Sequence, residues 1–204
     1  MAFQHVAFAT RDLAATHAFY TEVMGFELVK VVVGPTEGGG WAKHAFYDTG
    51  GEGMIAFWEL HDDSIAPGWT TELSTGLGLP LWVNHLAFSS ASLEELARRR
   101  RHWQEHGITV VEIDHGFCTS IYATDPNGVM VEFCCQTRPF TDGERADAER
   151  LLRDPAPCTR PTGSCPSRTP GATPSCAAGS DGALTGRRAR PGPTPRRRAR
   201  SPSW

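Results

Sequence analysis

The tetrapeptide His5-Val-Ala-Phe8 recurs at an offset of 80 residues as His85-Leu-Ala-Phe88. Leu13, which opens an apolar-periodic stretch, recurs as Leu93 at the same offset. Three further landmarks match in the same order, at offsets between 75 and 82: Met24-Gly25-Phe26 with His106-Gly107-Ile108, Phe46-Tyr47 with Ile121-Tyr122, and Gly53-Met54-Ile55 with Gly128-Val129-Met130. Matching segments in a constant order indicate an internal repeat of one supersecondary unit.

Each copy of the repeat predicts a helix after its first strand. The first helix is expected over residues 13–23, between a capping Asp12 and Gly25. The second is expected over residues 93–105. Its boundary signals are Ser92 as the N-cap, Glu95 as a capping-box partner and Gly107 as the stop.

Three apolar segments after each helix predict three more strands. They cover residues 26–33, 42–47 and 54–60 in the first copy and residues 109–113, 119–123 and 129–134 in the second. Neither four-stranded copy closes on itself, so the two are expected to pair around a shared cleft. The predicted fold class is α+β, with two βαβββ modules that form an open-barrel cleft.

The predicted domain occupies residues 3–140. Module 1 covers about 3–60, a linker covers 61–81, and module 2 covers about 82–137. A short helical extension is expected over residues 141–154.

The last fifty residues differ sharply in composition from the rest of the chain. Residues 1–154 hold 11 Lys and Arg against 22 Asp and Glu, whereas residues 155–204 hold nine Arg, one acid and ten of the fifteen Pro. Such a segment is too poor in large apolar residues to form a core, which predicts a disordered Arg/Pro-rich tail. Its composition resembles an out-of-frame (frameshift) translation of GC-rich DNA. A nucleic-acid-binding arm is the disfavoured alternative.

The chain shows no run near the roughly 18 apolar residues of a membrane-spanning helix, and its first residues lack the pattern of a signal peptide. These observations predict a cytoplasmic protein with no membrane partner.

Three residues are candidates for a metal site in the predicted cleft. His5 and His85 occupy the same position in the first strand of each copy, and Glu132 lies in the apolar segment Val129-Met-Val-Glu-Phe-Cys134. A buried carboxylate needs a cation as partner, either an arginine or a metal. Two imidazoles and one carboxylate with open coordination positions suit Fe(II), Mn(II) or a similar ion.

Glu59 is the fourth candidate ligand. In a gap-free alignment of the repeat, Glu132 falls opposite Phe57, and strand alternation places Glu59 on the same face as Phe57. The residue is therefore either an inward-pointing ligand or a carboxylate at the rim.

These motifs resemble the vicinal oxygen chelate superfamily of glyoxalase I, bleomycin-resistance proteins and extradiol ring-cleaving dioxygenases. The resemblance covers about residues 3–140. It rests on the paired modules, on His-Val-Ala-Phe followed by Phe19-Tyr-Thr-Glu-Val-Met-Gly-Phe26, and on Asp125-Pro-Asn-Gly-Val-Met-Val-Glu132. It implies a small-molecule substrate and a homodimer.

The segment from Ile113 to Glu132 resembles the signature of the ring-cleaving dioxygenases. That resemblance implies that Glu132 is the carboxylate ligand, with His115 and Tyr122 as catalytic groups beside it, and that His5 and His85 are the imidazole ligands. An Fe(II) ion with open positions would then bind a catechol-like substrate through two vicinal oxygens, together with O2.

The dioxygenases carry a further histidine in the module of the first ligand, where this sequence reads Gly51-Glu-Gly53. His44, one strand earlier, is a candidate substitute. A glyoxalase I-like lyase is the second possibility, in which Glu59 completes a four-ligand Zn(II) or Ni(II) site for a hemithioacetal. A metal-free drug-binding protein is the third. Four aromatic residues are candidates for the pocket wall: Trp41, Phe57, Trp58 and Trp69.

Overall fold

The computed structural model describes residues 3–155. The tail predicted from residue 155 onward therefore lies, apart from its first residue, outside the described residues. Within residues 3–155, no helix has both the length and the apolar character required to cross a membrane.

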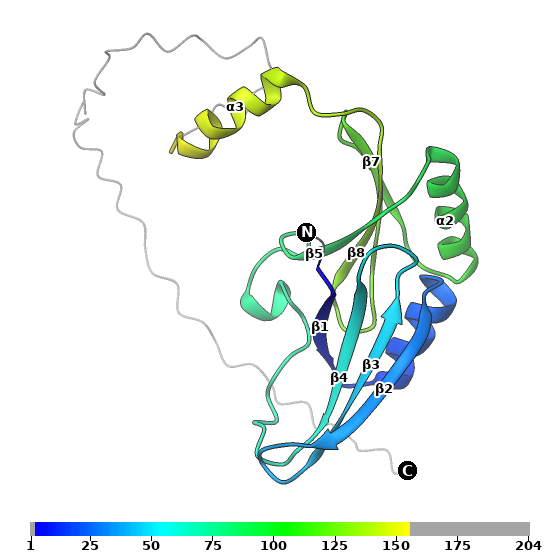
Figure 1. The fold of residues 1–204 in the computed structure, drawn as a ribbon, viewed down its shortest axis with the longest axis vertical. Helices are drawn as coiled ribbons and strands as arrows, with labels where there is room; N and C mark the ends of the chain where they lie inside the picture. Colours follow the sequence, from blue (N-terminus) through cyan, green and yellow to red (C-terminus); the bar gives the residue numbers. More distant parts are fainter. Residues whose placement is uncertain (1–2, 156–204) are drawn as a thin grey trace, which may run out of the picture. The chain divides into compact units, whose positions relative to one another are not determined.

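The chain folds into two βαβββ modules, as the repeat predicts (Figure 1). Module 1 consists of β1 (His5–Thr10), α1 (Leu13–Ala18), the π-helical turn η1 (Phe19–Val23), β2 (Glu27–Pro35), β3 (Trp41–Asp48) and β4 (Met54–His61). Module 2 consists of β5 (His85–Ser89), α2 (Leu93–Glu105), β6 (Val111–Asp114), β7 (Cys118–Thr124) and β8 (Met130–Gln136). The 3-10 turn η2 (Thr75–Leu77) lies between them, and α3 (Asp142–Arg153) follows.

Each module contributes one four-stranded mixed sheet. The strand order is β1-β4-β3-β2 in the first sheet, here called sheet A, and β5-β8-β7-β6 in the second, called sheet B. The first strand of each module pairs in parallel with the last, and the other pairs are antiparallel. The α+β prediction is confirmed.

The helix boundaries follow the capping signals in the sequence. The Asp12 side chain accepts a hydrogen bond from the Ala15 N–H, and the Ser92 side chain accepts one from the Glu95 N–H. The predicted capping box of α2 differs in one detail. The Glu95 carboxylate accepts from the N–H of Ala91, 2.7 Å away and one residue before the cap.

The strand register corrects the alignment of the repeat. His5 pairs with Met54 in sheet A, and His85 pairs with Met130 in sheet B, so β4 and β8 correspond at an offset of 76 residues. The residue equivalent to Glu132 is therefore Ala56, and the predicted equivalence with Phe57 is wrong. A shift of one residue moves a side chain to the other face of a strand.

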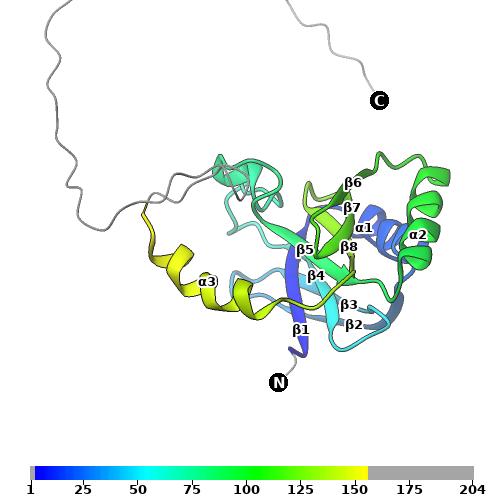
Figure 2. The same ribbon diagram turned by 90° about the horizontal axis from the view of Figure 1, so that it is seen from above.

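One hydrophobic core joins the helix-bearing faces of both sheets. Phe26 of module 1 packs against Phe88 and Phe133 of module 2, with ring centroids 5.0 and 6.4 Å apart. The fully buried indole of Trp103 donates from Nε1 to the carbonyl oxygen of Val23 at 3.1 Å. In Figure 1 the helical segment of module 1 (blue) accordingly lies directly below α2. Figure 2 shows the two helices, α1 and α2, from above.

A buried polar network adds a second connection between the modules. The Asp125 carboxylate, in the turn before β8, accepts from the Tyr20 hydroxyl at 3.0 Å and from the main-chain N–H groups of Asn127 and Val129. Burial raises the pKa of Asp125, and these hydrogen bonds oppose that rise. The Asn127 side chain also donates to Thr16 of α1 at 3.2 Å.

Substitution of Tyr20 by Phe is expected to lower the free energy of unfolding by about 1–3 kcal/mol, because it removes a donor from a buried carboxylate. Urea denaturation measures the change. The control is Tyr47→Phe, since the Tyr47 hydroxyl makes a longer contact of 3.3 Å with His17. Equal losses in both variants would contradict the role given to the Tyr20 hydrogen bond.

Candidate functional site

His85 and Glu132 meet on the face of sheet B opposite the core. His85 starts β5, and Glu132 lies in the neighbouring strand β8, opposite Ala87. The His85 Nε2 atom is 3.2 Å from Glu132 Oε2. The Glu132 side chain is only 7% exposed, whereas that of His85 is 38% exposed. The Glu132 carboxylate is thus buried, and the His85 imidazole beside it is accessible to solvent.

A second hydrogen bond fixes the orientation of the His85 ring. Its Nδ1 atom lies 3.0 Å from the main-chain oxygen of Trp82. A carbonyl oxygen can only accept, so Nδ1 carries a proton, and Nε2 of the neutral ring presents its lone pair to Glu132. Two acceptors that face each other at 3.2 Å require a proton or a cation between them. Nitrogen and carboxylate ligands of this kind fit a divalent transition-metal ion.

Tyr122 and His115 extend this pair toward the surface. Tyr122 lies opposite Glu132 in the antiparallel pair of β7 and β8. Its hydroxyl group is 2.9 Å from Nε2 of the exposed His115. Burial raises the pKa of Tyr122, and the charge of Glu132 and a hydrogen bond to it add to the rise. The structure therefore brings four of the predicted site residues together on sheet B.

His5 does not join them within one chain. Its ring lies on sheet A, 5.9 Å from the ring of His44 and 5.3 Å from that of Phe46, and Nδ1 contacts the side-chain oxygen of Gln4. Among residues 3–155, no group of three or more His, Cys, Asp or Glu side chains is placed to hold a metal ion. Within the described part of one chain, His5 is therefore not placed with His85 and Glu132, and the metal site that these three residues would form stays a prediction.

The shared core explains this separation. The helix-bearing faces of both sheets pack into one cluster that includes Tyr47 and Phe57 from sheet A and Ile121 and Phe133 from sheet B. The opposite face of each sheet, called its inner face below, therefore points away from that core. His5 lies on the inner face of sheet A, and the His85–Glu132 pair lies on the inner face of sheet B.

His44 lies on the same face of sheet A as His5. It is 8% exposed, and its imidazole stacks on the Trp58 indole with centroids 3.8 Å apart and planes inclined by 12°. Its buried Nε2 atom has no hydrogen-bond partner in the described part of the chain. Burial lowers the pKa of His44, and the nearby His5 lowers it further.

Glu59 lies on the helix-bearing face of β4, away from His5. Its carboxylate forms an ion pair with Lys43 at 3.1 Å and lies 3.2 Å from His61 Nε2. Burial alone would raise the pKa of Glu59, but hydrogen bonds from His61 and Lys43 and the charge of Lys43 lower it overall. The structure does not place this residue with the other candidate ligands.

The four aromatic candidates for the pocket wall have different positions. Phe57 is buried in the core, Trp41 stacks on His61 at 3.8 Å, and Trp69 lies beneath the guanidinium group of Arg11. Trp58 alone among them lies on the inner face of sheet A and lines a cavity there.

Comparison with known protein families gives one match over most of the chain. A model described as the Glyoxalase/Bleomycin resistance protein/Dioxygenase superfamily matches residues 2–133. No curated protein matches the chain significantly.

Several solved structures have a similar fold. A glyoxylase/bleomycin resistance protein/dioxygenase domain from Frankia sp. EAN1pec is 21% identical, with a TM-score of 0.51, over 67% of this chain and 98% of that one. Lactoylglutathione lyase from Agrobacterium tumefaciens is 22% identical, with a TM-score of 0.47, over 66% and 92%. The fosfomycin resistance protein FosX from Listeria monocytogenes is 20% identical, with a TM-score of 0.48, over 71% and 98%. At 21% identity, the likeness to the Frankia domain shows the fold alone.

Substitution of Glu59 by Gln is expected to lower the unfolding free energy by about 0.5–1 kcal/mol at pH 7, because it removes the ion pair with Lys43. The folded-state pKa of Glu59 is lowered, so this contribution is present above the unfolded-state pKa and is lost as the pH falls through the folded-state value. The loss should therefore shrink toward pH 3 in urea titrations. The matched control is Glu52→Gln, in an exposed turn. A loss that does not depend on pH would contradict the assignment.

Proposed function

Because the chain belongs to the Glyoxalase/Bleomycin resistance protein/Dioxygenase superfamily, we propose that it is a divalent-metal-dependent enzyme with His5, His85 and Glu132 as metal ligands. The reaction that we propose is extradiol-type cleavage of a catechol-like substrate, with Fe(II) as the preferred ion. The 3.2 Å approach of His85 to a buried Glu132, beside the hydrogen-bonded Tyr122 and His115, carries this proposal.

A ligand set with a single carboxylate distinguishes this proposal from a glyoxalase I-like lyase. The position in sheet A equivalent to Glu132 is Ala56, which has no donor atom. Glu59 lies on the other face and is paired with Lys43. Three protein ligands leave open coordination positions, as dioxygen chemistry requires.

We infer that His5 comes from a second copy of the chain. The inner faces of both sheets carry exposed apolar side chains: Val32 is 42% exposed and Trp58 37% on sheet A, and Val111 is 54% exposed and Ile113 42% on sheet B. Large apolar side chains left exposed on a sheet face are candidates for burial against a partner. Sheet A of one copy would cover sheet B of the other, which places His5 opposite the His85–Glu132 pair in a homodimer.

His5, His85 and Glu132 would hold the divalent ion, which would supply open coordination positions for the two vicinal oxygens of the substrate and for O2. The chain supplies orientation and proton transfer. The Trp82 carbonyl holds the His85 ring through Nδ1, so that Nε2 remains available as a ligand. Tyr122 carries its proton at neutral pH, as a tyrosine hydroxyl ordinarily does. A proton that leaves a substrate hydroxyl group passes to Tyr122 Oη. At the same time the proton that Tyr122 carried moves to His115 Nε2. The exposed His115 then releases a proton to solvent.

Substitution of His85 by Ala is expected to reduce bound metal from about one ion per chain to a small fraction of that, because it removes one of three ligands. Elemental mass spectrometry of anaerobically purified protein measures the metal, and circular dichroism checks the fold. The controls are Glu59→Gln and His61→Ala, which change donor groups on the opposite face of sheet A and should retain the metal.

Oxygen uptake with simple catechols tests the reaction itself. Iron that survives Glu59→Gln, together with oxygen uptake that His85→Ala abolishes, supports the proposal. If the protein instead binds zinc or nickel, loses that metal in Glu59→Gln and turns over a hemithioacetal, the glyoxalase I-like lyase is the correct function and the dioxygenase is not. Undiminished metal in His85→Ala would refute the ligand set.

A further inference from the structure

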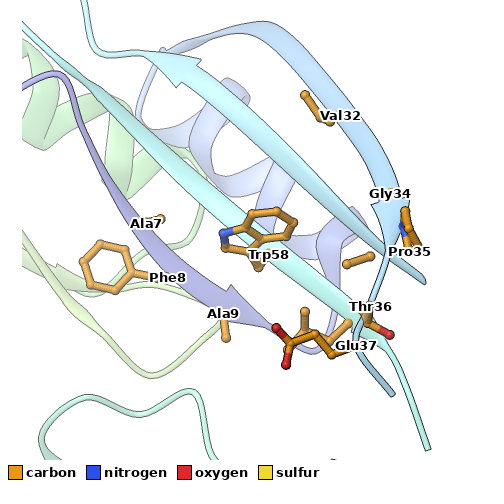
Figure 3. Close-up of a pocket in the computed structure, with 11 residues that line it drawn as sticks. Ala7, Phe8, Ala9, Val32, Gly34, Pro35, Thr36, Glu37 and Trp58 are labelled. Carbon is orange, nitrogen blue, oxygen red and sulfur yellow. The ribbon is translucent and has the colours of Figure 1, made fainter. Parts of the chain in front are cut away.

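A cavity of about 560 Å³ lies on the inner face of sheet A (Figure 3). We propose that it binds a planar aromatic ring system belonging to the substrate, with a preference for neutral or cationic over anionic groups. This inference deepens the proposed function and rests on it in one respect: the same substrate would carry the metal-binding oxygens. In the homodimer the cavity would lie in the cleft between sheet A of one copy and sheet B of the other.

The shape of the cavity suits a flat ring. Its floor carries the small residues Ala7 and Ala9 of β1 and Ala42 of β3, which leave open space above the sheet. Apolar side chains from β2 and β4 surround this floor: Val32, Pro35 and Leu60. The volume falls within the range of about 300–1,000 Å³ that is typical of small-molecule sites.

Trp58 provides a rigid surface for stacking. Its indole is 37% exposed and lies in the cavity in front of β4 (Figure 3). One side of the indole is held by the parallel imidazole of His44, at a centroid distance of 3.8 Å. An indole supported in this way stacks on an aromatic ligand with little loss of side-chain entropy.

The first lining residue on the inner face of β1, Ala7, is two residues along the strand from the proposed metal ligand His5. His5, Ala7 and Ala9 share one face of β1, at successive spacings of about 7 Å along the strand. The rings of His5, His44 and Trp58 form a connected series with centroid distances of 5.9 and 3.8 Å. A substrate whose oxygens lie near His5 would therefore place an attached ring system over Trp58.

The charge of one lining residue determines which ring substituents the cavity favours. Of the described residues that line the cavity, Glu37 is the one with an ionisable side chain. It lines the same cavity as Ala9 and Trp58 (Figure 3). An anionic ring substituent at this rim would be repelled, whereas a cationic one would be attracted.

Binding of naphthalene compounds to chelator-treated full-length protein tests the proposal without reference to catalysis. Ligand-observed NMR follows naphthalene, and titration calorimetry follows 1-naphthylmethylammonium and 2-naphthoate. Trp58→Ala should weaken naphthalene binding about threefold to tenfold, because it removes the surface on which the ring stacks. Ala42→Leu, which fills the floor and keeps the indole, should weaken it similarly. The matched control Trp41→Ala removes an indole that is 42% exposed on the opposite face of sheet A, outside the cavity, and should have no effect.

The ammonium compound should bind more tightly than the naphthoate, and Glu37→Gln should remove that preference. Equal naphthalene binding by wild type, Trp58→Ala and Ala42→Leu would overturn the ring site. Tighter binding of the naphthoate would overturn the charge preference. Two further measurements separate the ring site from the proposed metal site. If only the ring site fails, Trp58→Ala still binds metal. If only the metal site fails, His85→Ala still binds naphthalene.

Discussion

The hydrogen bond from Trp103 to the Val23 carbonyl lies at the centre of the structure. It joins the end of the first module's helical segment to the second module's helix inside a core that both modules share. Because the helix-bearing faces meet in this core, both inner faces are left exposed. The division of the candidate site into His5 on one sheet and His85 with Glu132 on the other follows from that packing. So does the apolar surface that we assign to a second copy.

Much of the fold could be predicted from short-range signals. The helix over residues 93–105 has the bounds that Ser92 and Gly107 predict, and the matching landmarks identified both modules. The register of the repeat could not be predicted in the same way. Gly53 immediately precedes β4, whereas one residue separates Gly128 from β8, so an alignment that equates the two glycines is wrong by one position. In a strand that single step reverses the face, and for this reason Glu59 was a candidate ligand.

Site residues that lie close together in the sequence could be predicted, whereas those brought together by the packing of the modules could not. Local sequence places Tyr122 and Glu132 on the two strands of one hairpin and His115 in the turn that precedes the first of them, and the structure brings all three together with His85. The position of His5 depends on how two modules pack, which a repeat pattern does not encode. The Trp82 carbonyl that orients His85 is a main-chain atom, so no side-chain motif could have indicated it. Ring stacking of His44 on Trp58 likewise depends on the three-dimensional arrangement of β3 and β4.

The central claim is that two copies of the chain complete each metal site, and a mixing experiment tests it most directly. His5→Ala and Glu132→Gln chains are each purified, then mixed under conditions that exchange subunits, and bound metal is measured by elemental mass spectrometry. Each variant alone should bind little metal. In a mixed dimer, His5 of the Glu132→Gln chain faces the intact His85–Glu132 pair of the His5→Ala chain, so the account predicts recovery of one site per mixed dimer. Subunit exchange with no recovery of metal would contradict it.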